Sequence, residues 1–228
     1  EAGYGFTSSS ASAFASRPAS KDDARIVDLI LGKQKEIAKG RGVHGTRYKT
    51  FDTALQNKIE AMTKAGTSFF VSGSFVATDL WDNPFSSKET AEKDQRFATE
   101  VLGYHWRVGQ ATVEGSAYQV QTRFDQLNAD ATYLFHATLN SESYAAESPD
   151  SFYAPDAKKG CTFLRYSENN LVAGTAFDNG AYRTVVIGFP FETISDAEAR
   201  TALMNRVLRF FEPVTKTAAT PAKKTKKR

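Results

Sequence analysis

Three short apolar runs stand out in the hydrophobic pattern of the chain. They cover residues 24–31 ("ARIVDLIL"), 67–73 ("TSFFVSG") and 182–187 ("YRTVVI"), and they are rich in β-branched and aromatic residues. Continuous apolar runs of this length are typical of strands that are buried on both faces. The pattern therefore predicts three buried strands.

Longer segments with a helical period lie between and after these runs. Helices are predicted at residues 50–66, 87–103 and 195–211. In the first, apolar residues recur at positions that share one helix face: Phe51, Leu55, Ile59 and Met62. Thr50 is the predicted cap of the first helix, and Ser195 with Glu198 has the spacing of a capping box for the last.

The middle of the chain has neither pattern. Residues 104–166 show no helical period and are predicted to form a β-rich insertion of short strands and loops. Asn179-Gly180 predicts a late hairpin, because type I′ turns need positive φ at both central residues. Strands that alternate with helices predict an α/β fold, in which a mostly parallel sheet carries helices on both faces.

The two ends of the chain differ in composition from the part between them. Residues 1–23 are small and polar and predict an extended entry segment, while 213–228 is a basic linker or tail. This leaves 24–212 as one α/β domain. No signal peptide is recognisable, and because the chain starts with Glu1 rather than Met, a targeting segment would lie upstream.

Charge and hydropathy exclude several partners. The net charge of +3 owes much to the tail, and the body has no basic stripe with interleaved aromatic residues, so no nucleic acid is expected. No run of about 18 apolar residues exists, so no membrane span is expected. A single cysteine, Cys161, excludes an internal disulfide, and no H-x-H or H-E-x-x-H spacing occurs, so neither a metal nor a cofactor is predicted.

The segment after the second strand comes closest to a catalytic motif. Ser72-Gly73-Ser74 follows a strand as the serine of a nucleophile elbow does, although it lacks the flanking glycine pair. A serine nucleophile also needs a histidine base, and His44 in the glycine-rich "GRGVHGT" loop is the candidate. The alternative is that these small residues only allow a tight turn that caps the next helix.

Other polar and aromatic residues at the predicted strand ends are candidates for ligand binding. Lys33 and Gln34 follow the first strand, and Asp79 and Trp81 follow the second. Aromatic faces stack on sugar rings while carboxylates accept hydrogen bonds from hydroxyl groups. The alternative is that they are ordinary core and rim residues.

Several motifs in order carry a family resemblance over nearly the whole chain. These are "GYGF", "VDLILGKQ", "VSGSFVATDLW", "SPDSFYAP", "FLRYSENNLVAG" and "RTVVIGFPFET". They resemble a domain of secreted Bacteroidetes proteins that carry the name xanthan lyase, often with a golvesin-like domain elsewhere in the chain. That domain is similar to the class I glutamine amidotransferases, so the resemblance implies a flavodoxin-like sheet and an extracellular, periplasmic or cell-surface location.

The resemblance also implies a degenerate active site. Ser74, or alternatively Ser72, stands where the amidotransferases place a cysteine, and Glu192 matches the glutamate of their His-Pro-Glu motif. The histidine is missing from "FPFE", so the nucleophile and the base are lost together. Glu192 is then expected to hold its turn by accepting backbone N–H groups of the next helix.

Three functions remain open on these grounds. The first is a non-catalytic module of a secreted or surface protein that assists polysaccharide binding or processing. The second is a hydrolase or polysaccharide lyase that uses Ser74 or the carboxylates of Asp79 and Glu192. The third is an interdomain scaffold whose strand-end crevice is filled by side chains such as Phe75. Expected partners are a polysaccharide and neighbouring domains of the same polypeptide.

Overall fold

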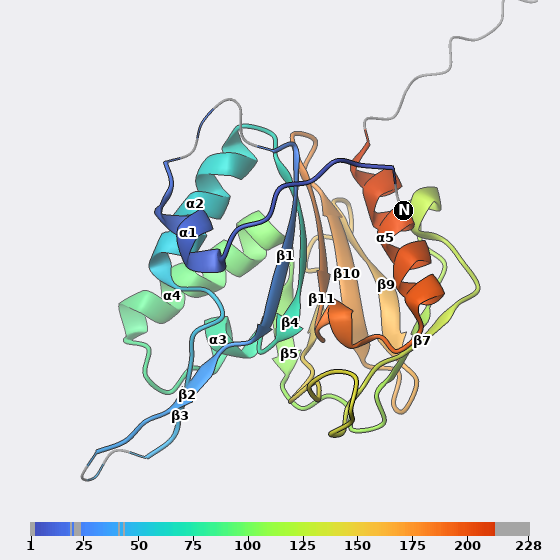
Figure 1. The fold of residues 1–228 in the computed structure, drawn as a ribbon. Helices are drawn as coiled ribbons and strands as arrows, with labels where there is room; N and C mark the ends of the chain where they lie inside the picture. The colour runs from blue at the N-terminus through green and yellow to red at the C-terminus, as the bar shows by residue number, and fades with distance from the viewer. Residues whose placement is uncertain (1–2, 19, 21–23, 41, 43, 213–228) are drawn as a thin grey trace, which may run out of the picture.

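The computed structural model describes residues 3–18, 20, 24–40, 42 and 44–212. Its centre is a seven-stranded mixed sheet in the order β1-β4-β11-β10-β9-β6-β7, which curls into a half-barrel (Figure 1). The predicted tail, residues 213–228, lies outside the described residues. Within the described part of the chain, no helix has the length and apolar character needed to cross a membrane.

Three parallel strands form one half of the sheet. They are β1 (Ile26–Lys33), β4 (Ser68–Ser74) and β11 (Arg183–Ile187), with β4 in the middle. Every residue of β4 is buried, because it has a strand on each side and side chains packed on both faces. These are the three strands that the apolar runs predicted.

Antiparallel strands form the other half, and they overturn the predicted fold. They are β10 (Val172–Asp178), β9 (Gly160–Tyr166), β6 (Ser116–Gln119) and β7 (Thr132–Leu134). The predicted flavodoxin-like, mostly parallel sheet is wrong, because the region 104–166 supplies strands to the sheet itself rather than an insertion beside it. Antiparallel neighbours need no crossover helix, which leaves the fold with few helices.

The helices lie on different parts of the two sheet faces. On one face, α2 (Thr53–Lys64) and α4 (Lys88–Arg96), which continues as the π-helical η1 (Phe97–Leu102), pack on the parallel half. On the other face, α5 (Ala197–Phe211) packs on β11 and the antiparallel strands (Figure 1). Two hydrophobic clusters, one on each face, therefore make up the core.

The smaller elements lie at the margins of this core. A projecting hairpin consists of β2 (Lys35–Ile37) and β3 (Thr46–Tyr48), and a second ribbon pairs β5 (His105–Val108) with β8 (Ser151–Tyr153). Short helical turns are α1 (Ala11–Ser16), α3 (Thr78–Trp81), η2 (Asp125–Leu127) and η3 (Phe191–Thr193). Helix α1 packs on α2, so the entry segment is not extended throughout as the sequence predicted.

Both predicted helix caps are shifted along the chain. The side chain of Asp52 accepts a 2.8 Å hydrogen bond from the backbone N–H of Leu55 and caps α2, in place of Thr50. Asp196 caps α5 in place of Ser195. In both cases the carboxylate is the stronger partner for the free N–H groups and positive end of a helix.

The predicted hairpin joins β10 to β11, but its turn is longer than expected. Asp178 and Arg183 are the last paired residues, and only Gly180 of the turn has positive φ, at 91°. The side chain of Asn179 accepts hydrogen bonds of 2.9 Å from the backbone N–H groups of Ala181 and Tyr182. An asparagine-capped four-residue turn therefore replaces the predicted type I′ turn.

Candidate functional site

The turn after β4 has the geometry of a nucleophile elbow. The strand ends at Ser74, the chain reverses at Phe75 with φ of 62°, and α3 starts at Thr78. An elbow of this kind exposes a reactive side chain from a strained position between a strand and a helix. Here that position holds a phenylalanine rather than the predicted Ser74, so the elbow carries no nucleophile.

The ring of Phe75 is buried rather than presented to solvent. It is 2% exposed, and its centroid lies 4.8 Å from that of Tyr48 on β3. The ammonium group of Lys35 lies 5.7 Å from the ring centroid, within the range of a cation–π contact. The side chain at the elbow is therefore packed against the β2–β3 hairpin.

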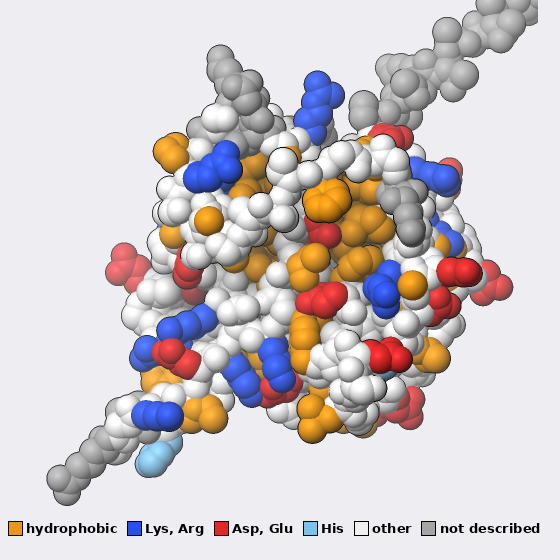
Figure 2. All heavy atoms as spheres, viewed as in Figure 1, with side chains coloured by type: hydrophobic (Ala, Val, Ile, Leu, Met, Phe, Trp, Pro, Cys, Tyr) orange, Lys and Arg blue, Asp and Glu red, His pale blue; other side chains and the backbone are white. Residues whose placement is uncertain are grey.

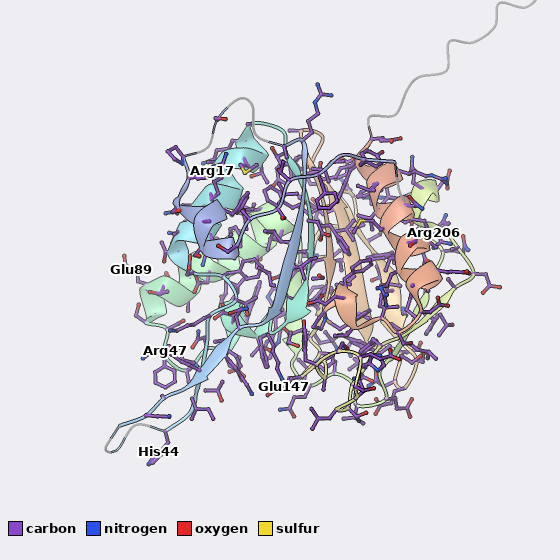
Figure 3. The ribbon with its side chains drawn as sticks, in the orientation of Figure 1. Arg17, His44, Arg47, Glu89, Glu147 and Arg206 are labelled. Carbon is purple, nitrogen blue, oxygen red and sulfur yellow. The ribbon has the colours of Figure 1, made fainter. Side chains whose placement is uncertain are left out.

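The predicted serine–histidine pair does not assemble. Ser72 and Ser74 are fully buried, and neither hydroxyl has a hydrogen-bond partner among the described residues. His44 is exposed at the tip of the β2–β3 hairpin, which projects away from the sheet (Figure 3). Neither serine therefore has a base that could activate it.

The backbone N–H groups beyond the elbow are occupied by a carboxylate from elsewhere in the chain. Asp150, which is fully buried, accepts hydrogen bonds of 2.7 Å from the N–H of Ala77 and 2.9 Å from that of Thr78. The hydroxyl of Thr78 donates to its other oxygen. These N–H groups lie at the start of α3, two and three residues beyond Phe75, and the protein's own side chain accepts hydrogen bonds from them.

Burial dominates the electrostatics of Asp150. Removal from water raises the pKa of this carboxyl to about 6, although the hydrogen bonds from Thr78 and Ala77 act in the opposite direction. The segment is held tightly, because a Cβ on Gly188 would lie 2.1 Å from the carbonyl oxygen of Asp150. This close approach explains the glycine of "GFPFE".

Glu192 interacts with Tyr144 and Asp28 rather than with the elbow. It lies in η3 and accepts a hydrogen bond from the Tyr144 hydroxyl, while its second carboxylate oxygen is buried without a partner. Burial raises the pKa of Asp28 on β1 to about 7, and the charge of Glu192 adds to the effect. Solvent still reaches part of Asp28. The predicted bonds from the next helix are not found, since Asp196 caps α5.

Asp79 and Trp81, the predicted sugar-binding pair, hold α3 in place. The carboxylate of Asp79 is 5% exposed and accepts 2.8 Å hydrogen bonds from the N–H of Phe51 and the amide of Asn83. Burial raises its pKa to about 6. Trp81 is half-buried, with its ring centroid 4.8 Å from that of His105. Asp79 and Trp81 therefore fix the position of α3.

Lys33 and Gln34 lie at the carboxyl end of β1 as predicted, and Lys33 contacts a neighbouring loop. The Lys33 ammonium lies 3.4 Å from Glu147, to which Lys35 also binds, and 5.9 Å from the centre of the Tyr144 ring. Glu147 projects at this end of the sheet in Figure 3. Gln34 donates a 3.2 Å hydrogen bond to the carbonyl of Leu31. The loop around 144–147 is thereby held at the end of β1.

The sequence analysis did not single out Asp28, Asp150 or Tyr144, whose side chains interact with the strand ends. Asp28 had a signal, since it is a charge within an otherwise apolar run. Asp150 and Tyr144 had none, because their partners lie far away in the sequence. Among the described residues there is no group of three or more His, Cys, Asp or Glu side chains placed to bind a metal.

A pocket exists at the opposite end of the parallel strands. It has a volume of about 590 Å³ and lies between α2, the α4–η1 helix and the β10–β11 turn. Lys64, Arg96 and Tyr182 are among the residues that line it. Phe75, Phe189 and Phe191, which follow the carboxyl ends of β4 and β11, are all buried.

Comparison with known proteins gives a distant likeness. No family model and no curated protein matches the chain. Among solved structures, a cold-adapted β-galactosidase from Rahnella sp. R3 is similar at 12% sequence identity with a TM-score of 0.45. The alignment covers 81% of this chain but 22% of that enzyme, so the chain spans about a fifth of its length.

Proposed function

We propose that the chain is a non-catalytic packing module of a larger protein, which corresponds to the scaffold alternative. The observation that carries the proposal is the filled elbow. A buried phenylalanine occupies the nucleophile position, and the Asp150 carboxylate occupies the N–H groups beyond it. Both changes replace reactive chemistry with contacts that stabilise the fold.

The hydrolase alternative lacks its required geometry. Asp79 binds the segment before α2, whereas Glu192 binds Tyr144, so the two carboxylates serve separate parts of the structure. A paired acid and base must face one bond of the substrate. The buried serines lack a base as well.

Activity assays test the non-catalytic role directly. The chain is incubated with ester, amide and glycoside substrates, and the absorbance of unsaturated uronates is followed with xanthan. We expect no turnover above that of Asp150→Ala, in which the elbow is perturbed. Turnover that is lost in Ser74→Ala or Glu192→Gln, with the fold intact by circular dichroism, would overturn the proposal.

Polysaccharide binding is a second candidate, favoured by a stack of rings on the β5–β8 ribbon. The rings of His105 and Tyr153 stack at 5.1 Å, His105 also contacts Trp81, and Tyr153 is 43% exposed. Exposed aromatic faces are suited to sugar rings. Affinity gel electrophoresis against xanthan and neutral polysaccharides tests it, with Tyr153→Ala expected to abolish any retardation and Tyr4→Ala as the control.

A further inference from the structure

The pocket at the amino ends of β4 and β11 is separate from the elbow. Its volume of about 590 Å³ is within the range of sites for small molecules, roughly 300–1,000 Å³. Three segments form its walls: the last turn of α2, the junction of α4 with η1, and the β10–β11 turn. None of these segments takes part in the elbow, so the pocket is a cavity of its own.

Part of the pocket wall is apolar and aromatic. Phe97 is buried, and the half-exposed edge of the wall includes Val101 and Tyr182. The Tyr182 hydroxyl donates a 2.9 Å hydrogen bond to the carbonyl of Val101 in η1. Helical turns of the π type, such as η1, occur often at functional sites. The pocket therefore has a fixed aromatic wall against which a ligand ring can pack.

Three cationic side chains line the same pocket from two helices. Lys64 ends α2, whereas Lys93 and Arg96 are three residues apart and are neighbours on the surface of α4. Helix dipoles favour cations in the last turn of a helix, which accounts for each position taken singly. They do not account for three cations around one cavity, because like charges brought together repel one another.

Several cations at the other end of the strands have close carboxylate partners. On the face drawn in Figure 2, Lys and Arg side chains lie beside Asp and Glu side chains near the lower, carboxyl end of β1. Lys33 and Lys35 bind Glu147 there, and Lys49 lies 2.7 Å from Glu36. The pocket cations do not follow this pattern.

The protein's own groups neutralise the pocket cations poorly. The Lys64 ammonium lies 4.0 Å from Glu60, at the limit of an ion pair. That of Lys93 lies 3.5 Å from the amide oxygen of Asn57. Within the part of the chain that the structure describes, the Arg96 guanidinium forms no ion pair or hydrogen bond. Charged donors are therefore left for a ligand.

The lining as a whole defines the chemistry of that ligand. The three cations share the pocket with two carboxylates, Glu60 and Glu100, which leaves one net positive charge. Carboxylates accept hydrogen bonds from hydroxyl groups. A phosphate group suits three separate cations, because it presents three acceptor oxygens around one centre. The pocket therefore fits a compact anion joined to a ring that bears hydroxyl groups.

We propose that this pocket binds a phosphate monoester of a hydroxylated ring compound, the chemistry shared by sugar phosphates and nucleoside monophosphates. The phosphate lies between Lys64, Lys93 and Arg96, and the Arg96 guanidinium donates two of the hydrogen bonds. The ring packs toward Tyr182, and its hydroxyl groups donate to the two carboxylates. This site goes beyond the packing role and does not depend on it, since it lies at the other end of the parallel strands.

Isothermal titration calorimetry of the whole chain tests the site with two esters, adenosine monophosphate and glucose phosphate (the ester at the primary hydroxyl). Adenosine, glucose and inorganic phosphate are the controls. We expect at least one ester to bind, and its control compounds to bind at least about tenfold more weakly. The ester that binds more tightly distinguishes a nucleotide site from a sugar phosphate site.

Variants that remove one charge each locate the binding. Arg96→Gln should weaken the binding of the ester at least about tenfold, and Lys64→Gln should weaken it as well. Lys88→Gln is the matched control and should leave the affinity unchanged, because it removes a positive charge from the same helix at a side chain that is 93% exposed and outside the pocket lining. Circular dichroism confirms that each variant folds.

Three results would overturn the inference. The first is that neither ester binds at millimolar concentration. The second is that inorganic phosphate binds as tightly as the ester, which would mean an adventitious ion only. The third is that Lys88→Gln weakens binding as much as Arg96→Gln does, which would mean a general attraction of anions to α4 rather than a site.

Discussion

Replacement of Asp150 separates the two forces that act on this buried carboxylate. Asparagine has the same shape and can keep every partner: its oxygen accepts from Ala77 and Thr78, and its amide donates to the Thr78 hydroxyl. Alanine leaves all three groups without a partner. The pair of variants therefore distinguishes the charge of Asp150 from its hydrogen bonds.

The magnitudes follow from the pKa and from the number of groups left unpaired. The pKa of Asp150 rises from 3.8 to about 6, so at neutral pH the buried charge costs about 3 kcal/mol relative to the protonated form. Because the pKa of Asp150 is higher in the folded than in the unfolded protein, the protonated carboxyl stabilises the fold. That stabilisation is fully present below pH 3.8 and is lost as the pH rises through 6. Alanine should cost about 4 kcal/mol or more at pH 4, and about 2.5 kcal/mol less than that at pH 8, because it also lacks the buried charge.

Urea denaturation of wild type and Asp150→Asn from pH 4 to 8 measures the effect. We expect the unfolding free energy of wild type to fall by about 2.5 kcal/mol relative to that of the variant over this range. The difference removes the contribution of Asp28, which is present in both proteins, whereas Asp79 acts on the charge of Asp150 and remains part of the measured effect. If the unfolding free energy of wild type instead rises relative to that of the variant as the pH rises, the hydrogen bonds from the start of α3 stabilise the charge more than burial destabilises it. That result would refute the reasoning.

Three further substitutions probe the elbow and its surroundings, each by chemical denaturation. Phe75→Ala should lose about 3–5 kcal/mol because a buried ring is removed, and a loss under 1 kcal/mol would show that the ring does not fill the site. Ser74→Ala should be neutral or stabilising by up to about 1 kcal/mol, since its buried hydroxyl has no partner, and a large loss would contradict that. Gly103→Ala should lose about 2 kcal/mol or more, because its Cβ would lie 2.3 Å from Phe177 at φ of 80°. Gly5→Ala, where nothing lies within 4 Å, is its control.

Local patterns were sufficient for the three longest helical segments and for the parallel strands. The period of residues 50–66 produced α2, and the apolar runs produced β1, β4 and β11. These elements depend on which face a residue presents, and that information lies within a few neighbouring positions. The hairpin signal of Asn179-Gly180 was also local and correctly paired β10 with β11.

Long-range pairing could not be predicted in the same way. The short strands between 104 and 166 have no signal that places them in the main sheet, because β6 and β9 are held by partners distant in the sequence. The prediction of a serine at the elbow was not met for a related reason. Positive φ is disfavoured for a large side chain such as Phe75, so tertiary contacts, among them those with Tyr48 and Lys35, must offset the cost.

The position of β4 between β1 and β11 governs the order in which the protein can be made. As the ribosome releases the chain, β1, β4 and α2 appear early, but the second neighbour of β4 is β11, the last of the strands among the described residues. Until β11 arrives, the most apolar strand of the sheet has an open edge, which is a hazard for aggregation. The sheet centre therefore forms only after residues 183–187 have been made, and until then β4 has β1 as its one strand neighbour.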